Sequence, residues 1–390
     1  MQPAFQVSDV LEAHWSQVQQ SEMFNTWQLR TLNAVRRCRT AALGSHVDGC
    51  TSCGHLRISY NSCRNRHCPK CQGTEREKWI QARQAELLPV PYFHVVFTLP
   101  DTLNRLCLFK PAILYGLLFK TTWSVINSFG HDPKWLGAQT GMISILHTWG
   151  QTMTLHPHLH CIVPGGGLTK QEKWKQAKSK GKYLFNVKAM STVFRGRFIA
   201  GLKEQLPKEL NPELLSKLYK HKWVVYAKRP FAGAGNVVEY LGRYTHKIAI
   251  SNHRIISHEN DRVTFSYKDY KQGSVKEEMT LDAREFIRRF SMHILPKGFV
   301  RIRHYGIVSS SAKHISSVMI KEQVSEKDIA LSAVISKIEP VVYNPKQCPC
   351  CKKETMETIM RFNLRGPPVD WKEMAKNLLE CIANSSATVE

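Results

Sequence analysis

Half of the cysteines in this chain lie within one short segment near its N-terminus. Six of the twelve fall between Cys38 and Cys71, where two Cys-x2-Cys pairs are separated by fourteen residues. This spacing is typical of zinc ribbons, in which two tight turns each supply two thiolates to one tetrahedral ion. Zinc with four such ligands is structural, because no position stays open for a substrate. The predicted ligands are Cys50, Cys53, Cys68 and Cys71.

The remaining candidate ligands of this segment could complete a second zinc site. They are Cys38, His46, Cys63 and His67. Cys38 could equally be a buried thiol, and His46 a surface residue. Three further cysteines, Cys348, Cys350 and Cys351, are either half of a site that is completed elsewhere or unpaired surface thiols.

The charge of the chain indicates the kind of partner. Lys and Arg total 55 against 31 Asp and Glu, a formal net charge of +24, which points to a polyanion and most often to nucleic acid. With 43% hydrophobic residues the chain can bury one large core or two ordinary ones, so general disorder is excluded. The sequence has neither a membrane-spanning apolar run nor a signal-peptide pattern. We therefore expect a soluble intracellular protein, whose cysteines bind metal or stay reduced.

Several segments have a clear periodicity. The aromatic and β-branched segment 92–99 predicts a strand, and the apolar segment 103–129 predicts a buried helix or helix pair. Segments 141–154 and 158–163 are expected to be further strands, the first of them alternatively a tight hairpin.

The sequence HPHLH at 156–160 is a candidate metal site. On a strand, His158 and His160 project from the same face while Leu159 faces the core. Two adjacent imidazoles form a platform for a divalent metal, although two partly exposed strand histidines would give the same pattern. For the third ligand we favour Gln151, on the preceding strand. The alternatives are His147 and His156.

A pair of tyrosines forms the second candidate site. Tyr240 and Tyr244 are spaced i, i+4 on a segment with helical periodicity, and Lys247 follows three residues later. Tyrosines at this spacing usually pack in a core. A tyrosine hydroxyl can also act as a nucleophile, which on a phosphodiester requires a metal. Lys247 could help the phenol lose its proton or hold a phosphate oxygen.

Arginines are frequent in the cysteine-rich segment and in the basic stretch 284–304. A solvated basic surface explains any one of them, but together they are candidates for contacts to the DNA backbone, with nearby aromatic residues available for base stacking. The predicted contacts are Arg64, Arg66, Arg243, Arg288, Arg289, Arg301 and Arg303.

Five motifs in family order resemble a known group of enzymes. They are CxxCG, YNSCRNRHCPKCQ, HPHLHCIVPGGG, YLGRYTHKIAIS and RRFSMHILPKGFVRIRHYG, spread over about residues 20–310. They resemble the two-tyrosine rolling-circle transposases of bacterial insertion sequences, in the HUH endonuclease superfamily. The resemblance implies that His158 and His160 bind the catalytic metal and that Tyr240 and Tyr244 are the nucleophiles.

The resemblance also implies an α+β fold, with an antiparallel sheet flanked by helices behind a small zinc-binding module. We expect a helical lead-in and zinc-binding domain at 1–88, with its zinc cluster at 38–71. A catalytic domain at 89–310 and a partly flexible C-terminal extension at 311–390 would follow.

The implied activity is nicking and transfer of single-stranded DNA through a 5′-phosphotyrosine, with catalytic Mg²⁺ or Mn²⁺ and structural Zn²⁺. The chain has no Walker-type GxxxxGK[ST] sequence, so we expect no nucleotide cofactor, and host helicase and replication proteins as partners. The expected location is the bacterial cytoplasm, at the nucleoid. The alternatives are a replication initiator or relaxase with the same chemistry, or a non-catalytic zinc protein that binds DNA.

Overall fold

The computed structural model describes residues 3–72, 87–88, 90–177, 184–227, 248–269, 272–324, 344–363 and 366–386. The predicted nucleophiles Tyr240 and Tyr244 lie outside these ranges, as do Arg243 and Lys247. Within the described residues, no helix is long and apolar enough to cross a lipid bilayer.

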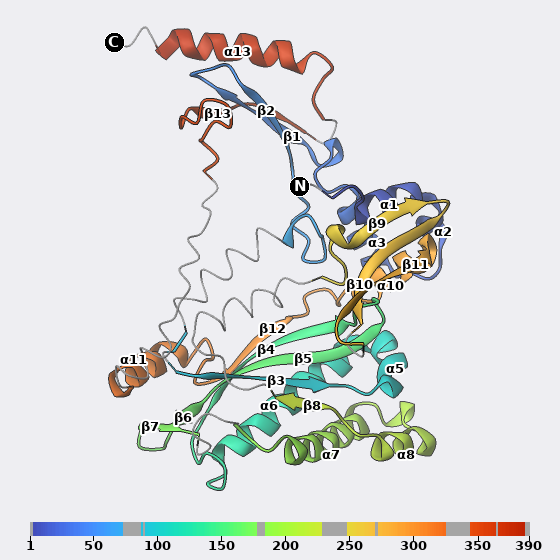
Figure 1. The fold of residues 1–390 in the computed structure, drawn as a ribbon, viewed down its shortest axis with the longest axis vertical. Coiled ribbons are helices and arrows are strands. Elements are labelled where there is room, and N and C mark those ends of the chain that lie inside the picture. Colours follow the sequence, from blue (N-terminus) through green and yellow to red (C-terminus); the bar gives the residue numbers. More distant parts are fainter. Residues whose placement is uncertain are drawn as a thin grey trace.

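A five-stranded antiparallel sheet, the largest of the described residues, lies in the lower half of the view in Figure 1. In spatial order its strands are β12 (Ile302–Gly306), β4 (Gly141–Trp149), β5 (Leu155–Pro164), β3 (Tyr92–Thr98) and β8 (Val225–Ala227). The strand predicted at 92–99 is confirmed as β3, and the one at 158–163 is part of β5. The α+β class with an antiparallel sheet is therefore confirmed.

The two faces of this sheet differ because side chains alternate along each strand. On β5, Leu159, Cys161 and Val163 enter the main apolar core. Ile162 faces the other way and belongs to a smaller core that also contains Ile320. His158 and His160 share the face of Ile162, since positions two apart on a strand point the same way.

Helices cover the face of the sheet that carries the main core. They are α5 (Asn104–Phe109), α6 (Pro111–His131), α7 (Val187–Gln205) and α8 (Pro212–Lys220). The helix pair predicted at 103–129 is thus confirmed as α5 and α6. Pro111 begins α6, where its missing N–H costs nothing, and the Asn186 side chain caps α7 by accepting from the Ala189 N–H. Phe97 of β3 packs edge-on against Phe194 of α7 at 5.1 Å.

A second core joins the N-terminal helices to a later part of the chain. It is formed by α1 (Val7–Ala13), α2 (Trp15–Gln20), α3 (Thr26–Arg36), β9 (Ile255–Glu259), β10 (Arg262–Asp269), β11 (Val275–Asp282) and α10 (Ala283–Ser291). The Val7 N–H donates to Asn252 Oδ1 at 3.1 Å, and Trp27 Nε1 donates to the Leu295 carbonyl at 2.9 Å. The first helices therefore pack against residues 249–295.

A third sheet brings the two ends of the chain together. Its strand order is β13-β1-β2, and the helix α13 lies beside it (Figure 1). The bounds are β1 (Ser45–Cys50), β2 (Leu56–Tyr60), β13 (Met356–Phe362) and α13 (Trp371–Ser386). The remaining elements are the hairpin β6 (Gly166–Leu168) and β7 (Trp174–Gln176), and the helix α11 (Lys313–Gln323).

Candidate functional site

Three histidines meet on the sheet face opposite α6 and α7. In the antiparallel register His147 of β4 lies directly opposite His158 of β5. The Nε2 atoms of His158 and His160 are 3.1 Å apart, and one ring nitrogen from each of the three histidines lies within 4.8 Å of the others. His147 and His160 are buried, whereas His158 is partly exposed. The histidine cluster (His147, His158 and His160) thus reaches the surface at His158.

Neighbouring groups orient two of these rings. His158 Nδ1 is 2.6 Å from the main-chain carbonyl of His156, which can only accept, so Nδ1 carries the proton and Nε2 keeps its lone pair. His160 Nδ1 is 2.9 Å from Nε2 of His94, and the two rings stack with centroids 5.1 Å apart. Such outer partners are the usual means by which proteins aim imidazoles at a metal. The donor set therefore fits a divalent ion.

His94 was not predicted from the sequence. It lies on β3, where its register partner on β5 is Ile162. Its side chain is 2% exposed. The available signal was a single histidine within an otherwise apolar strand, YFHVVFT, which alone is typical of a core histidine.

The third member of the histidine cluster is His147, an alternative to the favoured Gln151. Gln151 lies in the turn after β4, and its main-chain carbonyl accepts a hydrogen bond from Arg254 at 2.5 Å. His156, the other alternative, is exposed at the start of β5, with its ring centroid 5.1 Å from that of His158.

The cysteines form two quartets, and neither is the predicted one. The first quartet is Cys38, Cys63, Cys68 and Cys71, and the second is Cys50, Cys53, Cys348 and Cys351. The predicted partition is corrected because Cys50 ends β1, whose other neighbour β13 brings in the C-terminal cysteines. Of the C-terminal cysteines, Cys348 and Cys351 lie beside Cys50 and Cys53, whereas Cys350 is exposed.

The first quartet is compact and largely buried. The Cys71 sulfur is 3.5 Å from that of Cys38 and 3.7 Å from that of Cys63. Hydrogen bonds among the four thiols lower the pKa of Cys38 and Cys71 and raise the pKa of Cys63 and Cys68. Neither predicted histidine joins this group. His46 Nε2 is instead 3.7 Å from Asp48 Oδ2, and His67 lies at a separate buried cavity.

Most of the predicted DNA-binding arginines have partners within the protein. Arg66 donates to the Phe299 and Pro296 carbonyls, and Arg288 and Arg289 both bind Glu285. The other described arginines of the predicted set differ in their surroundings. Arg301 is buried at 8% exposure, Arg303 lies 4.3 Å from the ring centre of Phe119, and Arg64 is exposed.

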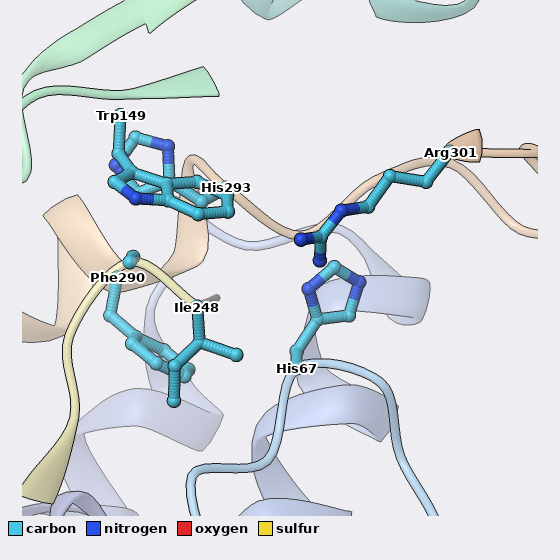
Figure 2. Close-up of a pocket in the computed structure, with 7 residues that line it drawn as sticks. His67, Trp149, Ile248, Phe290, His293 and Arg301 are labelled. Carbon is cyan, nitrogen blue, oxygen red and sulfur yellow. The ribbon is translucent and has the colours of Figure 1, made fainter. Parts of the chain in front are cut away.

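A small cavity separates the cysteine-rich segment from the end of β4 (Figure 2). Its lining includes His67, Trp149, Ile248, Phe290, His293 and Arg301. Its volume of about 10 Å³ suits a single water molecule and excludes a substrate. Burial lowers the pKa of His293 to about 4 and that of Arg301 to about 9. The Trp149 ring also stacks on the His147 ring, with centroids 4.7 Å apart, so a residue that lines this cavity packs against the histidine cluster.

Comparison with known proteins identifies relatives over most of the chain. Residues 141–315 match a family described as putative transposase, and residues 10–99 match one described as transposase zinc-binding domain. The putative transposase y4qJ of Sinorhizobium fredii (strain NBRC 101917 / NGR234) is 40% identical over 378 residues, covering 90% of this chain and 94% of that protein. The transposase for insertion sequence element IS801 of Pseudomonas savastanoi pv. phaseolicola is 27% identical over 309 residues, or 76% and 74%. No solved structure matches the chain.

The fold and the site define a mixed helix and antiparallel-sheet protein with a histidine cluster on its central strands and cysteine quartets of zinc-binding type. The chain belongs to the insertion-sequence transposases that carry an IS91-type zinc-binding domain. The family resemblance drawn from the sequence motifs is thereby confirmed.

Proposed function

We propose that this transposase nicks single-stranded DNA and transfers it through a covalent phosphotyrosine, as in rolling-circle transposition. The observation that carries the proposal is the convergence of His147, His158 and His160 on one sheet face, with a nitrogen of each within 4.8 Å of the others. Imidazoles suit a divalent transition metal, and three protein ligands leave coordination positions for substrate oxygens.

The histidine cluster would hold Mg²⁺ or Mn²⁺. When bound, such an ion acts as a Lewis acid that withdraws charge from the scissile phosphate. The protein's part is to aim the rings. The His156 carbonyl orients His158, and His94 orients His160. We assign His147 as the third metal ligand, because it lies opposite His158 in the register. Gln151 is the alternative third ligand that the experiment must test.

The proposed nucleophiles are Tyr240 and Tyr244. A phenolate oxygen attacks phosphorus, the bond from phosphorus to the 3′-oxygen breaks, and the strand end leaves as a 3′-hydroxyl after taking up a proton. One phosphoester replaces another, so no ATP is needed. A second tyrosine four residues away in the sequence could then act on another strand while the first is occupied. Lys247 would take up the phenol proton or hold a phosphate oxygen.

We assign the first quartet to structural zinc. Cys38, Cys63, Cys68 and Cys71 lie within the range that matches the zinc-binding family, and four thiolates leave no open position on the ion. DNA is the substrate that a transposase implies. Single-stranded element ends, target DNA and a host helicase are the proposed partners. Contacts to phosphates would come from exposed basic side chains such as Arg64.

A nicking assay tests the metal assignment. Purified protein and single-stranded DNA with candidate element ends are incubated with Mn²⁺, and cleavage is compared among wild type and single substitutions. We expect His158→Ala, His160→Ala and His147→Ala to lose at least about tenfold in rate, since altered metal sites commonly lose this much or more. The zinc content should not change.

The control is His314→Ala, which alters an exposed histidine on α11 away from the cluster and should cleave at the wild-type rate. Gln151→Ala separates the two candidate third ligands. Full activity of His147→Ala with loss in Gln151→Ala would reverse our choice. Cleavage at the wild-type rate in both His158→Ala and His160→Ala would contradict the metal site itself. Salt-sensitive binding without any cleavage by wild type would favour the non-catalytic alternative.

A further inference from the structure

The C-terminal cysteines meet the N-terminal hairpin across almost the whole chain. Cys50 and Cys53 lie at the β1–β2 turn, and Cys348 and Cys351 lie at a turn that precedes β13. The pairs that touch are 295 and 301 residues apart in sequence. Cys348 and Cys351 also lie outside both segments that match the transposase families, which end at residues 99 and 315.

The spacing of the four sulfur atoms fits zinc. The Cys50 sulfur is 3.6 Å from that of Cys351, the Cys53 sulfur is 3.7 Å from that of Cys348, and all four lie within 4.8 Å of one another. With zinc–sulfur bonds of about 2.3 Å, a tetrahedron has sulfur–sulfur edges of about 3.8 Å. Disulfides require about 2.05 Å, so these contacts are not paired bridges.

The two turns share one backbone pattern. In the first, the Gly54 N–H donates to the Cys50 carbonyl at 3.0 Å and the Cys50 N–H donates to the His55 carbonyl at 2.9 Å. The second repeats both bonds: Lys352 N–H to the Cys348 carbonyl at 3.0 Å, and Cys348 N–H to the Lys353 carbonyl at 2.8 Å. Two equivalent knuckles facing each other are the arrangement of a zinc ribbon.

The residue after each second cysteine supports this equivalence. Gly54 has φ +70° and Lys352 has φ +64°, so both occupy the left-handed region. Glycine adopts that region freely, whereas a lysine rarely does. The strained conformation at Lys352 is explained if the turn is shaped to point both thiolates of its knuckle at one ion.

The apolar core at the turn that carries the second quartet is small, although α13 packs on the sheet beyond it. The buried apolar cluster at this turn contains only Cys50, Cys348 and Met356, with Cys351 packed against it. A module with so small a core commonly depends on a metal. We propose that Cys50, Cys53, Cys348 and Cys351 bind a second structural zinc ion, which fastens β13 and α13 to the N-terminal hairpin.

Native thiol labelling tests this in the unmodified protein. Cys53 and Cys350 are both exposed, so burial alone would leave both open to a thiol reagent. Zinc binding predicts that Cys350 is modified rapidly while Cys53 is protected until a strong chelator is added, as mass spectrometry of the labelled peptides would show. Equally fast labelling of Cys53 and Cys350 in zinc-replete protein would overturn the proposal.

Zinc stoichiometry gives an independent measurement. We expect two zinc ions per wild-type chain, one in Cys348→Ser/Cys351→Ser, and two in the control Cys350→Ser. The double variant should also release residues 344–386 to a protease more readily than the control, because its C-terminal strand has lost its metal link. Two zinc ions in the double variant would contradict the site. A single zinc ion in both the wild type and the double variant would also contradict it.

Discussion

His94 is the residue whose role is most sharply defined by geometry. It is buried, and its Nε2 lies 2.9 Å from Nδ1 of His160, so the two rings share a hydrogen bond beside the histidine cluster. His94→Phe would keep the ring stacking and remove the hydrogen bond. We expect Mn²⁺ affinity to fall by about 10–100-fold, the usual cost of losing an outer-shell partner.

The measurement for His94→Phe is a Mn²⁺ titration followed by electron paramagnetic resonance. Zinc content serves as the control, because neither cysteine quartet includes a residue of β3. An unchanged Mn²⁺ affinity would mean that His94 is an ordinary core histidine.

His293 should make stability depend on pH. It is buried between Thr148 Oγ1 at 3.1 Å and the Met153 carbonyl at 3.0 Å, and burial lowers its pKa to about 4. The unfolded chain, with a pKa near 6.5, binds the proton first as the pH falls. The stabilisation of the folded state by neutral His293 is therefore complete above pH ~6.5 and is lost as the pH falls to about 4. This loss amounts to about 3 kcal/mol.

The check is the free energy of unfolding of wild type and His293→Gln across that pH range. Other titrating groups, the cysteines included, contribute to both proteins, so the wild type should lose about 3 kcal/mol more than the variant. Parallel pH profiles would show that His293 does not carry this dependence.

The edge strand β12 depends on one glycine. Gly306 has φ +59°, and a Cβ there would lie 2.1 Å from the Thr140 carbonyl oxygen. We expect Gly306→Ala to destabilise the fold by about 1–3 kcal/mol or more, since both the conformation and the contact oppose a side chain. Denaturant unfolding measures this change.

Gly116 of α6 offers a matched control for Gly306. Apart from its chain neighbours and the backbone of its own helix, a Cβ at Gly116 meets nothing within 4 Å. Because alanine favours a helix over glycine, Gly116→Ala should stabilise by up to about 1 kcal/mol. A Gly306→Ala protein as stable as wild type would mean that β12 can shift away from β4.

Local patterns predicted the elements better than their partners. The alternation of His158 and His160 and the strand at 92–99 follow from a period of two residues, which any strand imposes. The residue opposite His158 depends on the register between β4 and β5, and this register shifts between His147 and Trp149. Because the sequence does not reveal this shift, it could not decide between His147 and Gln151 as the third ligand.

The cysteine quartets show the same limit over a longer distance. Two Cys-x2-Cys pairs fourteen residues apart are typical of one ribbon, yet each pair has its partner elsewhere. The pairing of β1 with β13 decides this, and a strand contact between residues about 300 apart leaves no local trace in the sequence. The second core likewise joins segments that are far apart in the sequence, because α1 to α3 pack against residues 249–295.

The charge of the protein as a whole agrees with a nucleic-acid substrate, but few of the predicted arginines are free to provide it. Arg66, Arg288 and Arg289 bind groups within the protein, and Arg301 is buried. The net charge of +24 is therefore a general attraction for DNA rather than evidence for particular contacts. The proposed chemistry depends instead on the histidine cluster and on Tyr240 and Tyr244.

A covalent-adduct assay tests this chemistry most directly. Protein is incubated with labelled single-stranded DNA carrying candidate element ends and Mn²⁺, denatured, and examined for a protein–DNA adduct. We expect an adduct in wild type and in Tyr219→Phe, which alters an exposed tyrosine on α8, and none in Tyr240→Phe/Tyr244→Phe, in His160→Ala or without metal. An adduct that persists in the double tyrosine variant, or that forms equally without metal and in His160→Ala, would contradict metal-assisted attack by these tyrosines.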